Sequence, residues 1–213
     1  MMNADGSEAP PLGGASRFGN RAWKRLQKFS TMLISEGELR GLIGPHELGR
    51  LWSRHILNST AIVDFIPDGS FVVDVGTGAG FPGMVIAIIR PDLNLFLVES
   101  MERRSAWLHD VVDAIGLDNV EIYHGRAERL SHVIQADIVT ARAVASVRRL
   151  LPLTMPLLKS SGSLLTLKGS RVDEEINAAF DVFKKTRAAW ADVYDVIPFG
   201  TNEMTRVLEV RKK

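Results

Sequence analysis

Short apolar runs and amphipathic stretches alternate along most of the chain, a pattern that predicts strands of a parallel sheet joined by helices. The run at 71–75, rich in valine, is continuous enough to be buried on both faces of such a sheet. The predicted strands cover 71–75, 93–99, 120–123, 136–140 and 163–167, and a closing pair covers 191–199 and 205–210. Together they predict a doubly wound α/β fold with a mostly parallel, seven-stranded sheet and a terminal antiparallel hairpin.

Apolar residues that recur every three or four positions predict the helices. Trp23, Leu26, Phe29 and Leu33 define a helix over 18–35, which we expect to cover the sheet. The other predicted helices run through 48–57 after a Gly-Pro break at 44–45, then over 84–89, from 103 to 112, over 147–158 and over 173–188. The prolines inside 147–158 predict a kink or break in that helix.

Length and composition bound the organisation of the chain. With 213 residues, 46% of them hydrophobic, the chain can bury one substantial core, so we expect a single domain over 1–213. Residues 1–20 are rich in Gly, Pro, Ala and Ser, which predicts a disordered tail. We expect N-terminal helices over 21–70 and a cofactor-binding core over 71–213.

The residue inventory excludes several kinds of site. The sequence has no cysteine, which excludes disulfides and thiolate metal sites and favours a reducing cytoplasm. The five histidines lack a metal-ligand spacing such as His-x-x-x-His, so we expect no metal. No apolar run approaches the roughly 20 residues that span a bilayer, and no signal-peptide core begins the chain. We therefore expect a cytoplasmic protein with no membrane partner.

A glycine-rich turn follows the first predicted strand and precedes a helix. Gly78-x-Gly80-x-x-Gly83 fits the dinucleotide fingerprint, whereas Asp74-x-Gly76-x-Gly78-x-Gly80 fits the loop of S-adenosylmethionine (SAM) methyltransferases. A carboxylate at Asp74 would repel a pyrophosphate but would attract the amino group of a sulfonium amino acid. We therefore favour SAM as the ligand of this loop.

Polar residues also follow the other predicted strands. Glu99 ends the second strand, where an acid accepts the ribose hydroxyls of an adenosine. Arg126, Arg142 and Lys168 each follow a later strand. Because parallel strands bind ligands at their carboxyl edge, these cations predict an anionic substrate there.

Six segments resemble, in order, the RsmG (GidB) family and span nearly the whole chain after the tail. They are Arg54-His-Ile-Leu-Asn-Ser59, Asp74-Val-Gly-Thr-Gly-Ala-Gly-Phe-Pro-Gly83, Glu99-Ser-x-x-Arg-Arg104, Arg126-Ala-Glu128, Thr140-Ala-Arg-Ala143 and Leu167-Lys-Gly169. The resemblance implies a Rossmann-like, SAM-dependent methyltransferase fold and methylation of guanine N7 in the small-subunit (16S) ribosomal RNA of bacteria. Many members carry an Asn-Leu-Thr segment where this chain has Ile43-Gly-Pro-His-Glu47.

The resemblance also implies roles for individual residues. The cofactor positions are Gly76, Phe81, Ala127, Glu128 and Arg142, to which the loop reading adds Asp74, Gly78, Gly80 and Glu99. The RNA-facing positions are Arg54, His55, Arg103, Arg126, Lys168 and Arg206. We expect positioning by Arg142, Lys168 and His55 and no general base, because guanine N7 already presents a lone pair.

Two other functions remain possible from the sequence alone. One is a nicotinamide-dependent oxidoreductase, which Asp74 argues against, and the other is a noncatalytic RNA-binding module with a methyltransferase shell, which the intact glycines and Glu99 argue against. The sequence does not give the target nucleotide, the oligomeric state or the role of the tail. It also leaves open whether naked RNA or a ribosomal particle is the substrate.

Overall fold

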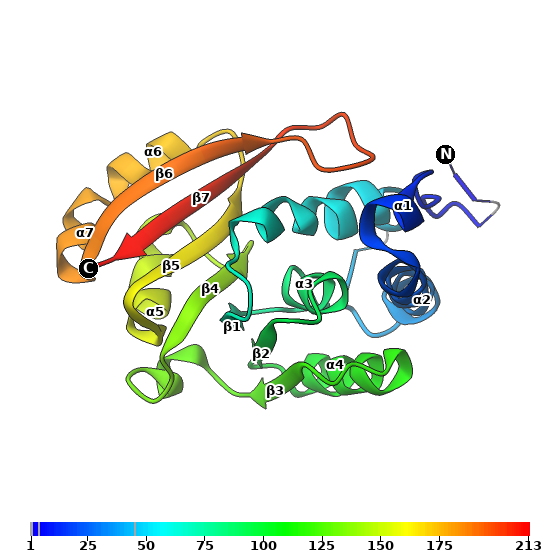
Figure 1. Cartoon of the computed structure of the whole chain (residues 1–213), viewed down its shortest axis with the longest axis horizontal. Helices are drawn as coiled ribbons and strands as arrows, with labels where there is room; N and C mark the ends of the chain where they lie inside the picture. The colour runs from blue at the N-terminus through cyan, green and yellow to red at the C-terminus, as the bar shows by residue number, and fades with distance from the viewer. Residues whose placement is uncertain (1, 4, 45) are drawn as a thin grey trace.

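One sheet of seven strands organises the computed structural model, which describes residues 2–3, 5–44 and 46–213 (Figure 1). The strand order is β3-β2-β1-β4-β5-β7-β6, in which β7 pairs antiparallel with β5 and β6 and the other pairs are parallel. The strands are β1 (Phe71–Val75), β2 (Asn94–Glu99), β3 (Val120–His124), β4 (Ala136–Arg142), β5 (Leu158–Lys168), β6 (Ala188–Val196) and β7 (Thr205–Lys212). The predicted α/β fold with a closing antiparallel hairpin is confirmed.

Helices connect these strands close to the predicted positions. They are α1 (Gly14–Phe18), α2 (Asn20–Glu36), η1 (Leu48–Arg50), η2 (Leu51–Leu57), η3 (Thr60–Phe65), α3 (Gly83–Ile89), α4 (Glu102–Ile115), η4 (Ala127–Leu130), α5 (Val147–Thr154), η5 (Met155–Leu157), α6 (Val172–Ala178) and α7 (Phe180–Lys185). Pro156 begins a tighter 3₁₀ turn after α5, as the prolines predicted. The predicted helix over 173–188 is instead two helices that meet at Ala179.

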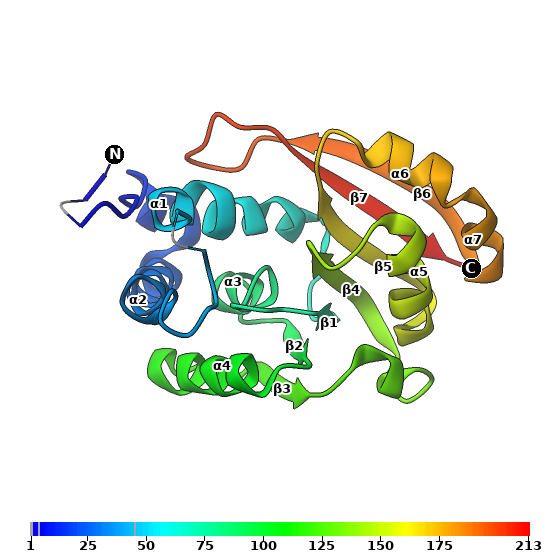
Figure 2. The same cartoon turned by 180° about the vertical axis from the view of Figure 1, so that it is seen from behind.

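The two faces of the sheet carry separate apolar cores. Because side chains alternate along a strand, Val72 joins the core under α2, α3 and α4, while Val73 joins the core under α5, α6 and α7. Figures 1 and 2 show α5, α6 and α7 together on one side of β4, β5 and β7. The parallel strands therefore have helices on both faces, which leaves their carboxyl ends open for a site.

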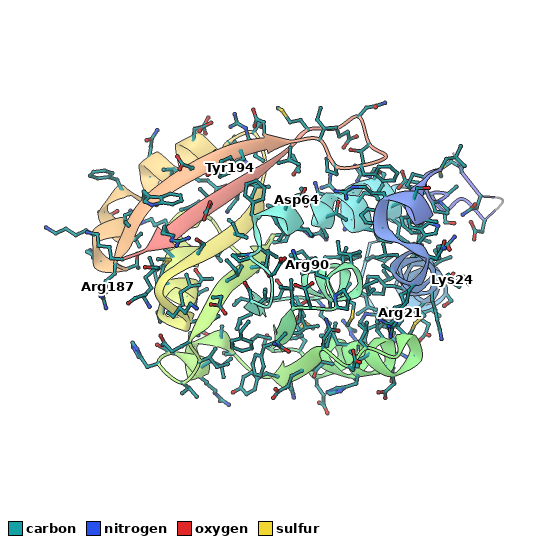
Figure 3. The ribbon with its side chains drawn as sticks, viewed as in Figure 1. Arg21, Lys24, Asp64, Arg90, Arg187 and Tyr194 are labelled. Carbon is teal, nitrogen blue, oxygen red and sulfur yellow. The ribbon has the colours of Figure 1, made fainter. Side chains whose placement is uncertain are left out.

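Helix α2 is amphipathic in the way its sequence predicts. Leu26, Phe29 and Leu33 are buried against the sheet side, and Figure 3 shows Arg21 and Lys24 extending outward. Within the described ranges, every helix is too short or too polar to cross a membrane.

The N-terminal stretch is more ordered than the sequence predicts. The ring of Phe18, in the last turn of α1, meets Phe199 edge-on with their centroids 5.6 Å apart, and Glu8 Oε2 accepts a hydrogen bond from the Ser53 backbone N–H of η2 at 2.8 Å. Ser7 is fully buried. In the structure these residues pack on η2 and the β6–β7 connection, which differs from the disorder expected over 1–20. Pro45, in the predicted Gly-Pro break, lies outside the described residues.

Candidate functional site

The glycine-rich turn leaves β1 and bends back beside the end of β2. Gly76 and Gly78 have φ angles of 67° and 61°, a left-handed conformation that glycine adopts without steric cost. The Gly76 backbone N–H donates to the Val98 carbonyl at 2.9 Å, and the Gly78 N–H donates to Glu99 Oε2 at 3.0 Å. A Cβ built at Gly78 would have no neighbour closer than 3.9 Å. This turn therefore presents bare backbone to open space.

A hollow of about 490 Å³, which we call the glycine-loop hollow, opens above this turn. Its floor includes the glycine turn and Phe81, and its walls come from Glu99, Arg104 and the ends of η2 and β4. The lining residues are Leu42, Ile43, Gly44, Glu47, His55, Gly76, Thr77, Gly78, Ala79, Phe81, Glu99, Ser100, Met101, Arg104, Arg142, Ala143 and Val144. The structure thus brings Gly76, Gly78, Phe81, Glu99 and Arg142 together, as the sequence predicted.

Asp74 does not reach this hollow. Its side chain is fully buried, with Oδ2 accepting from the Gly83 N–H at 2.9 Å and Oδ1 accepting from the Thr140 hydroxyl at 2.7 Å. Burial raises the pKa of Asp74 to about 6, although the hydrogen bonds from Thr140 and Gly83 act in the opposite direction. In the structure Asp74 ties β1 to the start of α3 and to β4, and its direct contact with a cofactor stays a prediction.

Gly80 also points away from the hollow. A Cβ at this position would lie 2.9 Å from Met84 Cβ and 3.2 Å from the Phe29 ring of α2. The structure shows a packing role for Gly80, since a side chain there would push α2 away from the loop, and its cofactor role stays a prediction. Spacing alone could not separate Gly80 from Gly78, because direction depends on how the turn is wound.

Arg142, at the end of β4, lies over the ring of Phe81 with its guanidinium carbon 4.8 Å from the ring centroid. Its NH1 donates to the Arg54 carbonyl at 3.1 Å, and its NH2 contacts His55 Nδ1 at 2.9 Å. The other ring nitrogen of His55, Nε2, is 2.6 Å from Glu47 Oε2. A continuous chain of contacts therefore links Glu47 through His55 and Arg142 to Phe81.

Burial lowers the pKa values of the two linked residues His55 and Arg142. The pKa of His55 falls to about 4, first because the ring is desolvated and second because Arg142 is positively charged. The pKa of Arg142 falls to about 10, mainly through desolvation, while the charge of Asp74 acts to raise it. At neutral pH, His55 is therefore an uncharged imidazole and Arg142 is a cation.

A second hollow, of about 600 Å³, lies beyond the ends of β4 and β5, and we call it the strand-end hollow. Its lining residues are Ser53, Arg54, His55, Asn58, Arg142, Ala143, Val144, Ala145, Ser146, Leu167, Lys168, Gly169, Glu175, Pro198, Thr201, Glu203, Met204 and Thr205. It shares His55, Arg142, Ala143 and Val144 with the glycine-loop hollow. These four residues form the junction of the two hollows.

The cations of the strand-end hollow differ in their surroundings. The Arg54 side chain is 57% exposed and lies 3.4 Å from Glu47. The Lys168 side chain is only 9% exposed, and its Nζ donates to the Ala145 carbonyl at 2.9 Å and to Glu175 Oε2 at 2.8 Å. Both cations therefore pair with a carboxylate, but the Lys168 side chain is largely buried whereas the Arg54 side chain faces solvent.

Several residues expected at the site lie outside both sets of lining residues. They are Arg103, Arg126, Ala127, Glu128 and Arg206. Arg206 forms ion pairs with Asp173 and with Asp195, the latter at 3.1 Å. Arg103 and Arg126 are exposed, and Ala127 is buried on η4.

Of the charged residues that line the glycine-loop hollow, Arg104 and Glu47 were not among the predicted site residues. Arg104, in the first turn of α4, has a buried Nε with no hydrogen-bond partner among the described residues. Its position five residues after Glu99 was a signal, since the first turn of the next helix returns to the same strand end. No sequence pattern indicated Glu47, because the residues that it contacts, His55 and Arg54, lie in the helix η2 further along the chain. Within the described part of the chain, no group of three or more His, Asp or Glu side chains could hold a metal ion.

Comparison with known sequences identifies one family. A family model described as "rRNA small subunit methyltransferase G" (GidB) matches residues 22–195. A protein of that name from Beutenbergia cavernae is 47% identical over 184 residues, which cover 86% of this chain and 87% of the relative. The corresponding protein from Clavibacter sepedonicus is 45% identical over 202 residues, covering 95% of this chain and 94% of the relative.

Solved structures share the fold at much lower identity. A SAM-dependent O-methyltransferase from Thermotoga maritima aligns with a TM-score of 0.59 and 15% identity, covering 78% of this chain and 70% of that one. M. jannaschii TYW2 in complex with AdoMet aligns with a TM-score of 0.54 and 17% identity, covering 75% of this chain and 76% of that one. The arrangement of strands and helices is therefore the Rossmann-like arrangement of SAM methyltransferases.

Proposed function

The chain belongs to the GidB family of small-subunit rRNA methyltransferases, and on this premise we propose that it transfers the methyl group of SAM to N7 of a guanine in small-subunit rRNA. The observation that carries the proposal is the pair of hollows that share His55, Arg142, Ala143 and Val144. One hollow has the features of a cofactor site, and the other has room for a base. A nicotinamide oxidoreductase and a noncatalytic module are not favoured.

The residues of the glycine-loop hollow fit SAM. The bare Cα of Gly78 leaves space that a side chain would fill. Glu99, held by hydrogen bonds from the Gly78 and Met101 backbone N–H groups, would accept the ribose hydroxyls. Arg104 Nε, without a partner among the described residues, is a donor that a carboxylate would satisfy. Phe81 adds an apolar ring to the floor.

The proposed reaction needs alignment more than proton transfer. Bound SAM supplies an electrophilic methyl group on its sulfonium. Guanine N7 attacks with an in-plane lone pair, so no base must remove a proton. Arg142, stacked over Phe81 at the junction of the hollows, would hold the base near the glycine loop, and the surrounding apolar residues would keep water away.

The RNA would enter through the strand-end hollow, where the exposed guanidinium of Arg54 can meet a phosphate. We propose that residues 1–213 act as one domain in this reaction, because η2 and the ends of β4 and β5 line the same hollow. The substrate would be met in the cytoplasm, as free rRNA or within a ribosomal particle.

The test of the function is methyl transfer to small-subunit RNA lacking the modification. Purified protein, SAM with a labelled methyl group and 30S subunits or naked 16S RNA from a strain deleted for the gene are combined, and the labelled position is mapped. We expect label at N7 of one guanine. Label on another atom would overturn the N7 assignment, and binding of RNA with no methyl transfer would favour a noncatalytic module.

The single-turnover rate with bound RNA is expected to vary little between about pH 7 and 8.5, because His55 stays neutral there and guanine N7 carries no proton to remove. Rapid-quench measurement of methyl transfer across this range checks it, with His55→Ala measured in parallel. A steep rise with pH in the wild type that disappears in His55→Ala would assign proton transfer to His55 and contradict the alignment mechanism.

Arg54 and Lys168 are expected to differ in how they affect the salt dependence of RNA binding. Arg54→Ala should lower the slope of log affinity against log salt by about one unit, since one phosphate contact is lost. Lys168→Ala should change the slope much less, because Glu175 already neutralises its ammonium group. The phosphate contact expected for Lys168 from sequence is the alternative that this comparison tests. RNA titrations at several salt concentrations measure both slopes, and a larger change for Lys168→Ala would restore the sequence expectation.

A further inference from the structure

Glu47 directly precedes η1 and lines the glycine-loop hollow, although it lies outside every motif of the sequence. Its Oε2 lies 2.6 Å from His55 Nε2 and 3.4 Å from Arg54 Nε, and its Oε1 accepts from Arg50 at 2.9 Å. The hydrogen bond from His55 and the nearby cations keep the pKa of Glu47 below its usual value, against the effect of burial. Glu47 is therefore a carboxylate with a fixed position.

The contacts of His55 determine its tautomer. A guanidinium has only donors, so Arg142 NH2 must donate to His55 Nδ1, and Nδ1 must carry a lone pair. The neutral ring then carries its proton on Nε2, and this N–H donates to Glu47. The two hydrogen bonds of the His55 ring depend on each other. If Nδ1 carried the proton instead, its N–H would face the N–H of Arg142 NH2, and Nε2 would have no proton to donate to Glu47.

The ring in turn limits where Arg142 can lie. The ring of His55 packs against Phe81 with their centroids 5.2 Å apart, and its Nδ1 holds one end of the Arg142 guanidinium by hydrogen bonding. The Arg54 carbonyl holds NH1. The guanidinium is thereby kept over Phe81 at the junction of the two hollows.

We propose that Glu47 is a positioning residue that acts through His55 to hold Arg142 across Phe81. The proposal rests on the proposed function for the importance of Arg142, but its geometry involves only residues of this chain. Glu47 also lines the glycine-loop hollow and pairs with Arg54, but its shortest contact, at 2.6 Å, is the one to His55. Its effect on methyl transfer is therefore expected through the His55–Arg142 contact, while RNA affinity reports separately on Arg54.

Replacing Glu47 with alanine should lower the single-turnover rate about tenfold or more at saturating SAM and RNA, because a misplaced positioning group weakens alignment. RNA affinity should stay the same or rise, since a negative charge near Arg54 is lost. Glu47→Gln should recover most of the rate, because the amide oxygen can accept from the same His55 N–H. A general electrostatic role would not be rescued by this neutral side chain.

Glu8→Ala is the matched control for a merely structural effect. Glu8 is also a carboxylate that fastens η2, since its Oε2 accepts from the Ser53 backbone N–H at 2.8 Å, but it does not contact His55. If loosening η2 were enough to lower the rate, Glu8→Ala and Glu47→Ala should behave alike. We expect only the second to slow methyl transfer at saturating substrates.

Nitrogen-15 NMR of histidine-labelled protein reads the tautomer without SAM or RNA. In the wild type and in Glu47→Gln, His55 should show a protonated Nε2 and an unprotonated Nδ1 at pH 7.5. In Glu47→Ala, the signals should move toward a mixture of tautomers. This measurement does not depend on the reaction, so it separates failure of the positioning proposal from failure of the proposed function.

A double-mutant cycle completes the test. If Glu47 acts through Arg142, adding Glu47→Ala to Arg142→Ala should lower the single-turnover rate no further. Fully additive losses, an unchanged His55 tautomer in Glu47→Ala, or equal loss in Glu8→Ala would each overturn the proposal. Absence of methyl transfer in the wild type, together with the expected NMR result, would overturn the proposed function instead.

Discussion

Gly78→Val is expected to abolish SAM binding while leaving the protein folded. The added side chain would project into the glycine-loop hollow, where a Cβ at this position meets nothing closer than 3.9 Å in the present structure. The substitution also places a β-branched residue at φ 61°, which costs on the order of 1–3 kcal/mol. Calorimetric titration with SAM measures the binding, and urea unfolding measures the strain.

Gly116→Val is the matched control for that strain. Gly116 ends α4 with φ 70°, and a Cβ there has no neighbour within 4 Å. The two variants should therefore lose similar free energies of unfolding, but only Gly78→Val should lose SAM binding. Undiminished SAM affinity in folded Gly78→Val would remove the glycine turn from the cofactor site.

Asp74→Ala is expected to lower the free energy of unfolding by about 3 kcal/mol or more at pH 7.5, because the Gly83 N–H and the Thr140 hydroxyl would be left buried without their acceptor. Asp74→Asn should be much milder. Its amide oxygen can accept from Gly83, and its NH₂ group can donate to the Thr140 oxygen. Urea unfolding of the three proteins measures the differences.

The comparison of Asp74→Asn with the wild type also has a defined pH dependence. Since the folded pKa of Asp74 is raised from 3.8 to about 6, its contribution to stability is complete below about pH 4 and is lost as the pH rises through 6. Relative to the wild type, Asp74→Asn should therefore gain on the order of 3 kcal/mol between about pH 4 and 7.5. If the difference in free energy of unfolding between Asp74→Asn and the wild type stayed constant across this range, the pKa of Asp74 would not be raised in the folded protein.

SAM binding adds a second criterion. Because both oxygens of Asp74 bond inside the protein, Asp74→Asn should bind SAM nearly as well as the wild type. A large loss of affinity in this folded variant would return Asp74 to the direct ligand role that the sequence suggested.

Sequence patterns predicted the fold because each strand carries its own signal. The valines of β1 and the leucines of β5 alternate between two buried faces, and this pattern needs no knowledge of the partner strand. The same local logic placed Gly76, Gly78 and Glu99 at one edge. The roles of residues that depend only on their place in a strand or turn could therefore be predicted from the sequence.

The roles of residues that depend on a distant partner could not be predicted from local sequence patterns. Lys168 is neutralised by Glu175, and the side chain of Asp74 turns inward to Thr140 of a neighbouring strand. The buried Ser7 and the Glu8–Ser53 contact turned a polar, glycine-rich stretch into ordered chain. Composition reports the average tendency of a segment, whereas a few specific hydrogen bonds decide its final conformation.

The order of strands at the hairpin edge also bears on how the protein folds. β6 precedes β7 in the chain, yet β7 lies between β5 and β6 in the sheet. β6 therefore joins the sheet only through β7, and until β7 has paired with β5 the backbone N–H and C=O groups of the hairpin stay open to other chains. A substitution that weakens the pairing of β7 with β5 should lengthen that interval during refolding and favour aggregation.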